Sequence, residues 1–365
     1  MVAMNESALN STDERARWSQ NPLIVTWEVT RSCVLACRHC RAKAIYRRDP
    51  RELSTDEAKH FIDQVARAAP RIFILTGGDP ICRSDLRYLI GYASSSGLHV
   101  AMSPSATPRF LKTDLEAFGR AGLQRVSLSL DGATNATHDA FRGISGPWNW
   151  TMAGIAKARA AGVGIQINTT FTRQNLHELE SFVRILDAIR PESWSLFQLV
   201  PVGRGKKEDL LTGEEMERLF ERLYELSQKV PYDIKTTEGQ HYRRVALQQW
   251  SLHGGRKPVV SDINDGKGFV FVSHVGEICP SGFLPVVAGN VRVDELIDVY
   301  RNAPIFRQLR DPDLLKGKCG RCEFRDLCGG SRARAYAITG DYLAQEPLCI
   351  YEPIDSVTRP VNVVS

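Results

Sequence analysis

The sequence has no long apolar segment and no large surplus of charge. None of its apolar runs approaches the ~20 residues that a membrane-spanning helix requires, and the polar first twenty residues contain no signal-peptide core. The formal net charge is only +5 over 365 residues, without a basic arm. We therefore expect a cytoplasmic protein that binds neither membrane nor nucleic acid, and we interpret 1–20 as a polar lead-in.

Cysteine is absent from the middle of the chain. None of the nine cysteines lies between Cys82 and Cys279, and seven of them form two groups near the ends of the sequence. The groups are Cys33, Cys37 and Cys40, and Cys319, Cys322, Cys328 and Cys349. Such clustering favours metal centres over a disulfide framework, and disulfides are rare in proteins with the composition of a cytosolic protein.

The first cysteine group follows an apolar run, 23–29, that is typical of a buried strand. Its C-x3-C-x2-C spacing places three soft thiolate ligands on the loop after that strand. A 4Fe–4S cluster takes one thiolate per iron, so three cysteines leave one iron open for a substrate or a cofactor. Structural zinc usually takes four protein ligands, often from two C-x-x-C pairs, which this loop does not provide.

Strands and helices alternate over the next part of the chain. Alternation of this kind predicts a parallel sheet covered by helices, with functional groups at the carboxyl ends of the strands. A complete eight-unit barrel takes ~250 residues, so six units predict a partial (β/α)6 barrel of the α/β class. The expected strands are 23–29, 71–76, 99–103, 125–130, 164–168 and 193–199, with helices at 54–66, 84–95, 113–121, 150–161 and 176–189.

We expect four segments along the chain. The lead-in 1–20 precedes the barrel 21–210, and a connecting helical segment, 211–265, leads to a C-terminal module at 266–365. Ser54 with Glu57 and Thr212 with Glu215 each form a capping box that predicts the start of a helix. A polar stretch follows at 235–244, and a hairpin at 268–278 opens the last module.

Gly77-Gly78-Asp79-Pro80 ends the second expected strand. Alone, this tetrapeptide is a common turn. One strand–helix unit after the three-cysteine loop, however, it resembles the Gly-Gly-Glu-Pro motif of radical SAM enzymes, with Asp79 in place of the usual Glu. The resemblance implies a 4Fe–4S cluster whose open iron binds S-adenosylmethionine (SAM) and a reductive cleavage that yields a 5′-deoxyadenosyl radical. The residues that it assigns to cofactor binding are His39, Gly77, Gly78, Asp79, Pro80, Ser103, Ser105, Ser129, Asp131 and Asn168.

The second cysteine group reads C-x2-C-x5-C and is completed by Cys349. Four thiolates close a cubane, although zinc is satisfied by the same four. The arrangement resembles the C-terminal SPASM module of radical SAM enzymes, which implies one auxiliary 4Fe–4S cluster. A second auxiliary cluster is not expected, because Asp294 and Arg332 stand where that module has further cysteines. Cys279 is then either a buried spare or a substrate-facing catalytic group, and Cys82 is a small core residue.

The segment 328–341 is very similar to one found in radical SAM enzymes that trim propionate side chains in alternative haem synthesis. The chain also looks like the cytosylglucuronate decarboxylases of nucleoside-antibiotic pathways. These resemblances imply hydrogen abstraction from a small carboxylated metabolite followed by decarboxylation, for example of a nucleoside uronic acid. The alternatives are decarboxylation or oxidation of a haem-type tetrapyrrole side chain, a SPASM peptide maturase, and an iron–sulfur carrier or zinc-stabilised binding module without SAM chemistry.

A carboxylated substrate requires a cation, and arginine binds carboxylates best through its bidentate fork. Arg204 directly follows the sixth strand and is our first candidate as a catalytic residue. The other candidates are Arg31, Arg173, Lys235, Arg243 and Arg244, and Asn168, Gln198, Glu238 and His241 are candidates to orient a polar substrate. A flavodoxin- or ferredoxin-type protein is the expected reductant.

Overall fold

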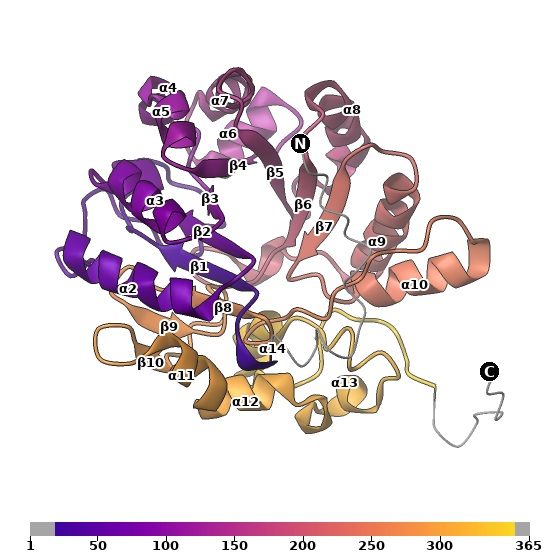
Figure 1. Ribbon diagram of the computed structural model, residues 1–365. Helices are drawn as coiled ribbons and strands as arrows, with labels where there is room; N and C mark the ends of the chain where they lie inside the picture. Colours follow the sequence, from indigo (N-terminus) through magenta and orange to yellow (C-terminus); the bar gives the residue numbers. More distant parts are fainter. Residues whose placement is uncertain (1–18, 355–365) are drawn as a thin grey trace.

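One ten-stranded sheet forms the centre of the computed structural model, which describes residues 19–354 (Figure 1). Most of the expected lead-in, 1–18, lies outside the described residues. The strand order is β10-β9-β8-β1-β2-β3-β4-β5-β6-β7, and all neighbours from β8 to β7 are parallel. The strands are β1 Ile24–Glu28, β2 Ile72–Thr76, β3 Val100–Met102, β4 Leu123–Ser129, β5 Gly164–Phe171, β6 Ser193–Gln198, β7 Asp233–Thr237, β8 Phe269–Val272, β9 Glu277–Cys279 and β10 Gly289–Asn290.

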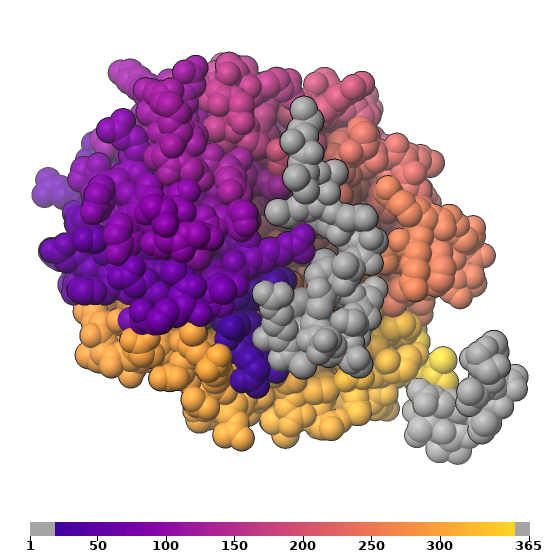
Figure 2. All heavy atoms as spheres, viewed as in Figure 1, coloured from indigo at the N-terminus to yellow at the C-terminus, as the bar shows by residue number. Residues whose placement is uncertain are grey.

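Helices cover the outer side of this curved sheet, and the C-terminal segment packs along one edge of it (Figures 1 and 2). Within the described residues, no helix is both long and apolar enough to cross a membrane. The helices are α2 Thr55–Ala68, α3 Leu86–Ser95, α4 Pro108–Lys112, α5 Leu115–Arg120, α6 Asn135–Arg142, α7 Pro147–Ala160, α8 Leu179–Ile189, α9 Gly213–Ser227, α10 Tyr242–His253, α11 Leu296–Asn302, α12 Pro304–Arg310, α13 Gly317–Arg321 and α14 Arg332–Thr339.

The six expected strands are all present as β1 to β6, and both capping boxes form, at the starts of α2 and α9. Two further parallel strands extend the sheet. β7 pairs with β6 inside the expected connecting segment, and β8, which forms the expected hairpin with β9, also pairs with β1. The polar stretch at 235–244 contains the end of β7 and the start of α10. The four-segment division remains a prediction.

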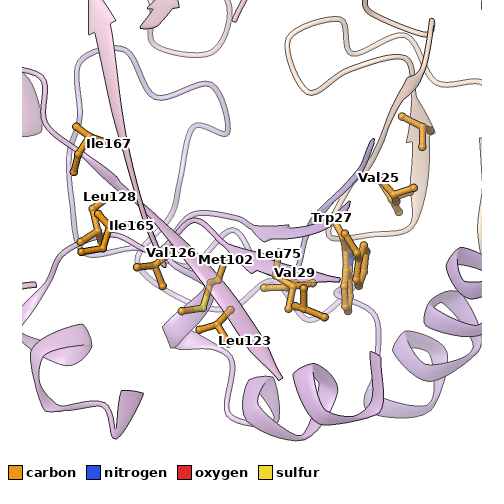
Figure 3. Close-up of a cluster of buried hydrophobic side chains, with 14 of the residues drawn as sticks. Val25, Trp27, Val29, Leu75, Met102, Leu123, Val126, Leu128, Ile165 and Ile167 are labelled. Atoms are coloured by element: carbon orange, nitrogen blue, oxygen red, sulfur yellow. The ribbon is translucent and has the colours of Figure 1, made fainter. Parts of the chain in front are cut away.

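Alternation along the strands separates a packed core from an internal cavity. Val25 and Trp27 of β1 are fully buried on the side that carries α2 and α3, whereas Ile24 and Thr26 line the cavity. The same alternation on the next strands adds further side chains to the core that contains Val25 and Trp27 (Figure 3). These are Leu75, Met102, Val126, Leu128 and Ile167. Successive side chains of a strand point to opposite faces, so the apolar half of the pattern forms the core.

Leu128→Ala is expected to lower the free energy of unfolding by about 2–5 kcal/mol, because Leu128 is fully buried and packs towards α7 near Gly154. Urea unfolding of anaerobically purified protein measures this change. Val293→Ala serves as the control, because Val293 is 82% exposed and its truncation leaves no cavity. A loss below about 1 kcal/mol for Leu128→Ala would contradict the assignment of this core.

Candidate active site and C-terminal cysteine centre

The three-cysteine loop lies at the carboxyl end of β1, and Cys33, Cys37 and Cys40 all line one cavity of about 1720 Å³. Their sulfur atoms accept hydrogen bonds from Leu35 N (3.4 Å, to Cys33) and Ala44 N (3.5 Å, to Cys40). Burial raises the pKa of Cys33 to about 11, so the free thiol is neutral. A bound metal centre deprotonates such thiols, and three soft donors on one loop fit an iron–sulfur cluster.

No three or more His, Cys, Asp or Glu side chains within residues 19–354 are arranged to hold a single metal ion. The fit of a cluster to this loop therefore rests on the chemistry of its donors and on their common cavity.

Gly77 and Gly78 also line the cavity, and they are required by a close approach to the cysteine loop rather than by unusual backbone angles. A Cβ atom on Gly77 would lie 2.4 Å from the Thr30 carbonyl oxygen, and one on Gly78 would lie 2.5 Å from the Arg31 carbonyl oxygen. Neither glycine has a positive φ. Gly78 N donates to Thr30 O (2.8 Å), so the motif and the cysteine loop are joined by their backbones.

Asp79 and Pro80 are buried and do not line the cavity. The Asp79 carboxylate accepts hydrogen bonds from Ser105 N (3.3 Å) and Thr107 Oγ1 (3.1 Å), and burial raises its pKa to about 6. Asp79 thus fixes the loop after β3, and Ser105 Oγ lies 3.6 Å from Cys33 Sγ. Direct contact of Asp79 and Pro80 with a cofactor remains a prediction, whereas the structural role of Asp79 is evident from these bonds.

The remaining predicted cofactor residues lie around the same cavity. Ser103, Ser105, Ser129, Asn168 and His39 line it.

The His39 ring packs against Phe141 with centroids 4.9 Å apart, and burial lowers its pKa to about 4. Within the described chain, His39 Nδ1 is buried without a hydrogen-bond partner. A neutral ring with an unused nitrogen is suited to contact a polar heterocycle.

Asp131 is buried behind the cavity wall, where it forms an ion pair with Arg142. Burial opposes its ionisation, but the Arg142 guanidinium holds the pKa of Asp131 below its usual value. Arg142 lines the cavity and donates to Cys37 Sγ (3.6 Å). Sequence reasoning missed Arg142, because α6, which carries it, has only eight residues and was not expected.

Arg204 is held against the cysteine loop. Its Nε donates to Cys37 O (2.8 Å) and its backbone N to Cys40 O (3.0 Å). The second terminal nitrogen, Nη2, is buried without a partner among residues 19–354, and Arg204 lines the cavity. The residue therefore positions the cysteine loop and also offers one unused N–H to a ligand.

Cys279 lies on β9, is 3% exposed and is not among the residues that line either cavity. Its burial raises the pKa of the thiol to about 12. This placement favours the buried-spare alternative, and a catalytic role for Cys279 remains a prediction without support from the geometry.

Arg31, Arg243 and Arg244, three of the candidate substrate cations, have other partners. Arg31 donates to the carbonyl oxygens of Ala42 (3.1 Å) and Lys43 (3.0 Å). Arg243 donates to the carbonyl oxygens of Leu327 and Ile263, and Arg244 forms an ion pair with Glu217. Of the candidates to orient a substrate, Asn168, Gln198 and Glu238 line the large cavity, whereas His241 does not. Both amide atoms of Gln198 are buried without a partner in the described part of the chain.

The four C-terminal cysteines line a second cavity, beside α10. Glu346 N donates to Cys319 Sγ (3.3 Å), and Gly330 N donates to Cys328 Sγ (3.4 Å). The Glu346 carboxylate forms a buried ion pair with Arg334 and so fixes the turn that leads to Cys349. Four thiols in one cavity with backbone donors to sulfur match the ligand set of a four-iron cluster.

Comparison with known proteins identifies the family. Residues 27–186 match the model of the Radical SAM superfamily. The chain is 41% identical to the AdoMet-dependent heme synthase of Methanosarcina barkeri over 341 residues, which cover 91% of this chain and 97% of that protein. The chain belongs to the radical SAM superfamily. Membership implies a 4Fe–4S cluster and SAM as cofactors of this radical SAM enzyme.

Two further proteins agree with this assignment. The AdoMet-dependent heme synthase of Nitratidesulfovibrio vulgaris is 40% identical over 340 residues, which cover 90% of this radical SAM chain and 92% of that protein. A crystal structure of Streptococcus suis SuiB bound to S-adenosylmethionine has the same fold, with a TM-score of 0.69 and 15% identity over 91% of this chain and 78% of that chain.

Gly143→Ala is expected to displace the cysteine loop, because a Cβ atom there would lie 2.6 Å from the Ala36 carbonyl oxygen. The iron content of reconstituted protein should fall towards that of Cys33→Ala, and the spectral response to SAM should weaken. Gly162→Ala is the matched control, because its φ of +66° resembles the +73° of Gly143 but its Cβ would meet nothing within 4 Å. Equal iron loss in both variants would show that backbone strain alone is responsible.

Proposed function

We propose that this radical SAM enzyme removes carboxylate groups from the propionate side chains of a haem-type tetrapyrrole. The observation that carries the proposal is the 41% identity to an AdoMet-dependent heme synthase across nearly the whole length of both proteins. Similarity of this extent covers the barrel and the C-terminal cysteine segment together. Neither of the two relatives described above has a name that refers to a nucleoside, so the tetrapyrrole alternative replaces the nucleoside uronic acid as the first candidate.

The cavity supports a large second ligand beside SAM. Its volume of about 1720 Å³ exceeds the ~300–1,000 Å³ of ordinary small-molecule sites. Phe197 and Phe283 contribute aromatic rings to the cavity, with centroids 6.3 Å apart. We assign this aromatic part of the cavity to the face of the tetrapyrrole.

Unused polar groups supply contacts for a carboxylate. Arg204 Nη2 and the Gln198 amide are buried, line the cavity and have no partner within residues 19–354. A buried donor without a partner costs about 1–3 kcal/mol, and a substrate carboxylate offers an acceptor to Arg204 Nη2 and to Gln198 Nε2. Because Arg204 also contacts the cysteine loop, a carboxylate bound there lies next to the reactive centre.

SAM, when reduced at the cluster, supplies the hydrogen-abstracting radical. The side chain –CH2–CH2–COO⁻ then loses one hydrogen atom, carbon dioxide and one electron, which leaves –CH=CH2 and balances the electron that SAM cleavage consumes. The protein contributes orientation by Gln198 and Arg204 and exclusion of water by the buried cavity wall. We further propose that the four C-terminal cysteines hold one auxiliary 4Fe–4S cluster.

Reduced enzyme, incubated anaerobically with SAM and an iron coproporphyrin, is expected to release carbon dioxide in proportion to 5′-deoxyadenosine. Mass spectrometry of the tetrapyrrole should show the matching loss of carboxyl groups. A parallel assay with cytosylglucuronate tests the alternative hypothesis that the substrate is a nucleoside uronic acid. Uncoupled formation of 5′-deoxyadenosine from the tetrapyrrole, without carbon dioxide, would reject the proposal.

Gln198→Leu is expected to reduce kcat/KM for the tetrapyrrole by about tenfold, because leucine has a size similar to that of glutamine but lacks its hydrogen-bond donor. The iron content and the spectral response to SAM should equal those of the unmodified enzyme, because Gln198 lies on β6 and not on the cysteine loop. An unchanged kcat/KM would exclude Gln198 from substrate binding.

We also propose that an acidic flavodoxin- or ferredoxin-type protein delivers the electron at the cysteine loop. Residues 31–51 include seven Lys or Arg and one acidic residue, Asp49, which is buried. Arg38, Lys43 and Arg47 are exposed there. Complementary charge accelerates association and is screened by salt.

Arg47→Glu should slow reduction by flavodoxin in stopped-flow experiments and weaken its dependence on salt. Reduction by dithionite should stay the same, because a small reductant needs no docking surface. If Arg47→Glu changes neither the rate nor its salt dependence, this docking surface is wrong.

A further inference from the structure

A buried histidine faces the cavity of the four C-terminal cysteines. His241 is 1% exposed and lines that cavity together with Cys319, Cys322, Cys328 and Cys349. Neither of its ring nitrogens has a hydrogen-bond partner among the described residues. An unsatisfied buried polar group costs about 1–3 kcal/mol. We therefore expect the ring to form a hydrogen bond with a bound group that is not part of the polypeptide.

The other nitrogen-bearing side chains of this cavity wall already have partners. Lys318 Nζ donates to Cys349 O (2.9 Å), and Arg325 Nη1 donates to Gly320 O (3.1 Å). Arg244 forms its ion pair with Glu217 and stacks over the Tyr351 ring at 4.8 Å. His241 therefore differs from these neighbours, because it lines the cavity of the four cysteines with both ring nitrogens unused.

A role as a fifth iron ligand is not needed. Four cysteines would give one thiolate to each iron of a cubane, so the ring would be available to a sulfur acceptor of the cluster rather than to an iron. Imidazole carries at least one N–H in both its neutral and its protonated forms. On another side, the ring packs edge-on against Phe220 with centroids 4.7 Å apart.

We propose that His241 donates a hydrogen bond to a sulfide of the auxiliary 4Fe–4S cluster and raises the reduction potential of that cluster. The inference rests on the auxiliary cluster proposed above. Reduction adds negative charge to the cluster sulfurs, and an N–H aimed at sulfur stabilises the reduced state more than the oxidised state. His241 is thus a positioning and tuning residue for the auxiliary centre and not a substrate-orienting residue.

The test uses the full chain with Cys33, Cys37 and Cys40 all replaced by alanine, so that only the auxiliary centre remains. Iron and sulfide analysis first establishes that this background protein holds a cluster. Redox titration followed by electron paramagnetic resonance then compares His241→Leu, His241→Gln and Phe220→Leu. His241→Leu removes the donor, His241→Gln retains an N–H donor, and Phe220→Leu changes the packing of the ring without changing the donor.

We expect His241→Leu to keep its iron and sulfide but to show a more negative potential than the background protein. His241→Gln should recover part of this shift, and Phe220→Leu should leave the potential near that of the background. An unchanged potential in His241→Leu, or an equal shift in Phe220→Leu, would overturn the proposal. Iron loss in His241→Leu would overturn it in favour of an iron ligand, and an iron-free background protein would overturn the auxiliary cluster itself.

Discussion

The three-cysteine loop depends on backbone hydrogen bonds that it receives from other strand ends. Gly78 N and Asp79 N donate to the carbonyl oxygens of Thr30 and Ser32, at 2.8 and 2.7 Å, and Ala36 N donates to Arg142 O at 3.2 Å. A loop without regular secondary structure is costly to order, and these bonds hold it between the turn after β2 and the end of α6. The position of the three thiols is therefore a property of the whole barrel and not of the loop alone.

Glycine is placed where those backbones meet. Gly77 and Gly78 on one side and Gly143 on another each bring a chain so close to the cysteine loop that a Cβ atom would overlap a carbonyl oxygen. Gly203 does the same beneath Cys40, with a Cβ position 2.3 Å from its carbonyl oxygen. The motif around Gly77 is thus explained by close packing against the cysteine loop.

The sequence was most informative where apolar periodicity is strong. The strands β1 to β6 and the two capping boxes were predictable, because alternating apolar residues and local hydrogen bonds determine them. β7, in contrast, is Asp-Ile-Lys-Thr-Thr and has a single apolar residue, so only its pairing with β6 makes it a strand. The two cysteine groups were predicted from the spacing of their cysteines. The contact of Arg142 with Cys37 could not be predicted in this way, because it spans 105 residues and depends on how α6 packs.

The segment after β7 explains why two cavities coexist in one sheet-based fold. Glu238 and Gln240 line the large cavity, whereas the next residue, His241, lines the cavity of the C-terminal cysteines. A single turn of chain therefore forms the wall between the two. Glu238 has a φ of +56°, a strained conformation for a residue with a side chain, and its buried carboxylate accepts a hydrogen bond from Ser331 beside Cys328. Strain held by such contacts is retained where a fold needs a fixed geometry. The hydrogen bond between Ser331 and Glu238 therefore joins the wall of the large cavity to the segment that carries Cys328, and the two cavities share this one stretch of chain.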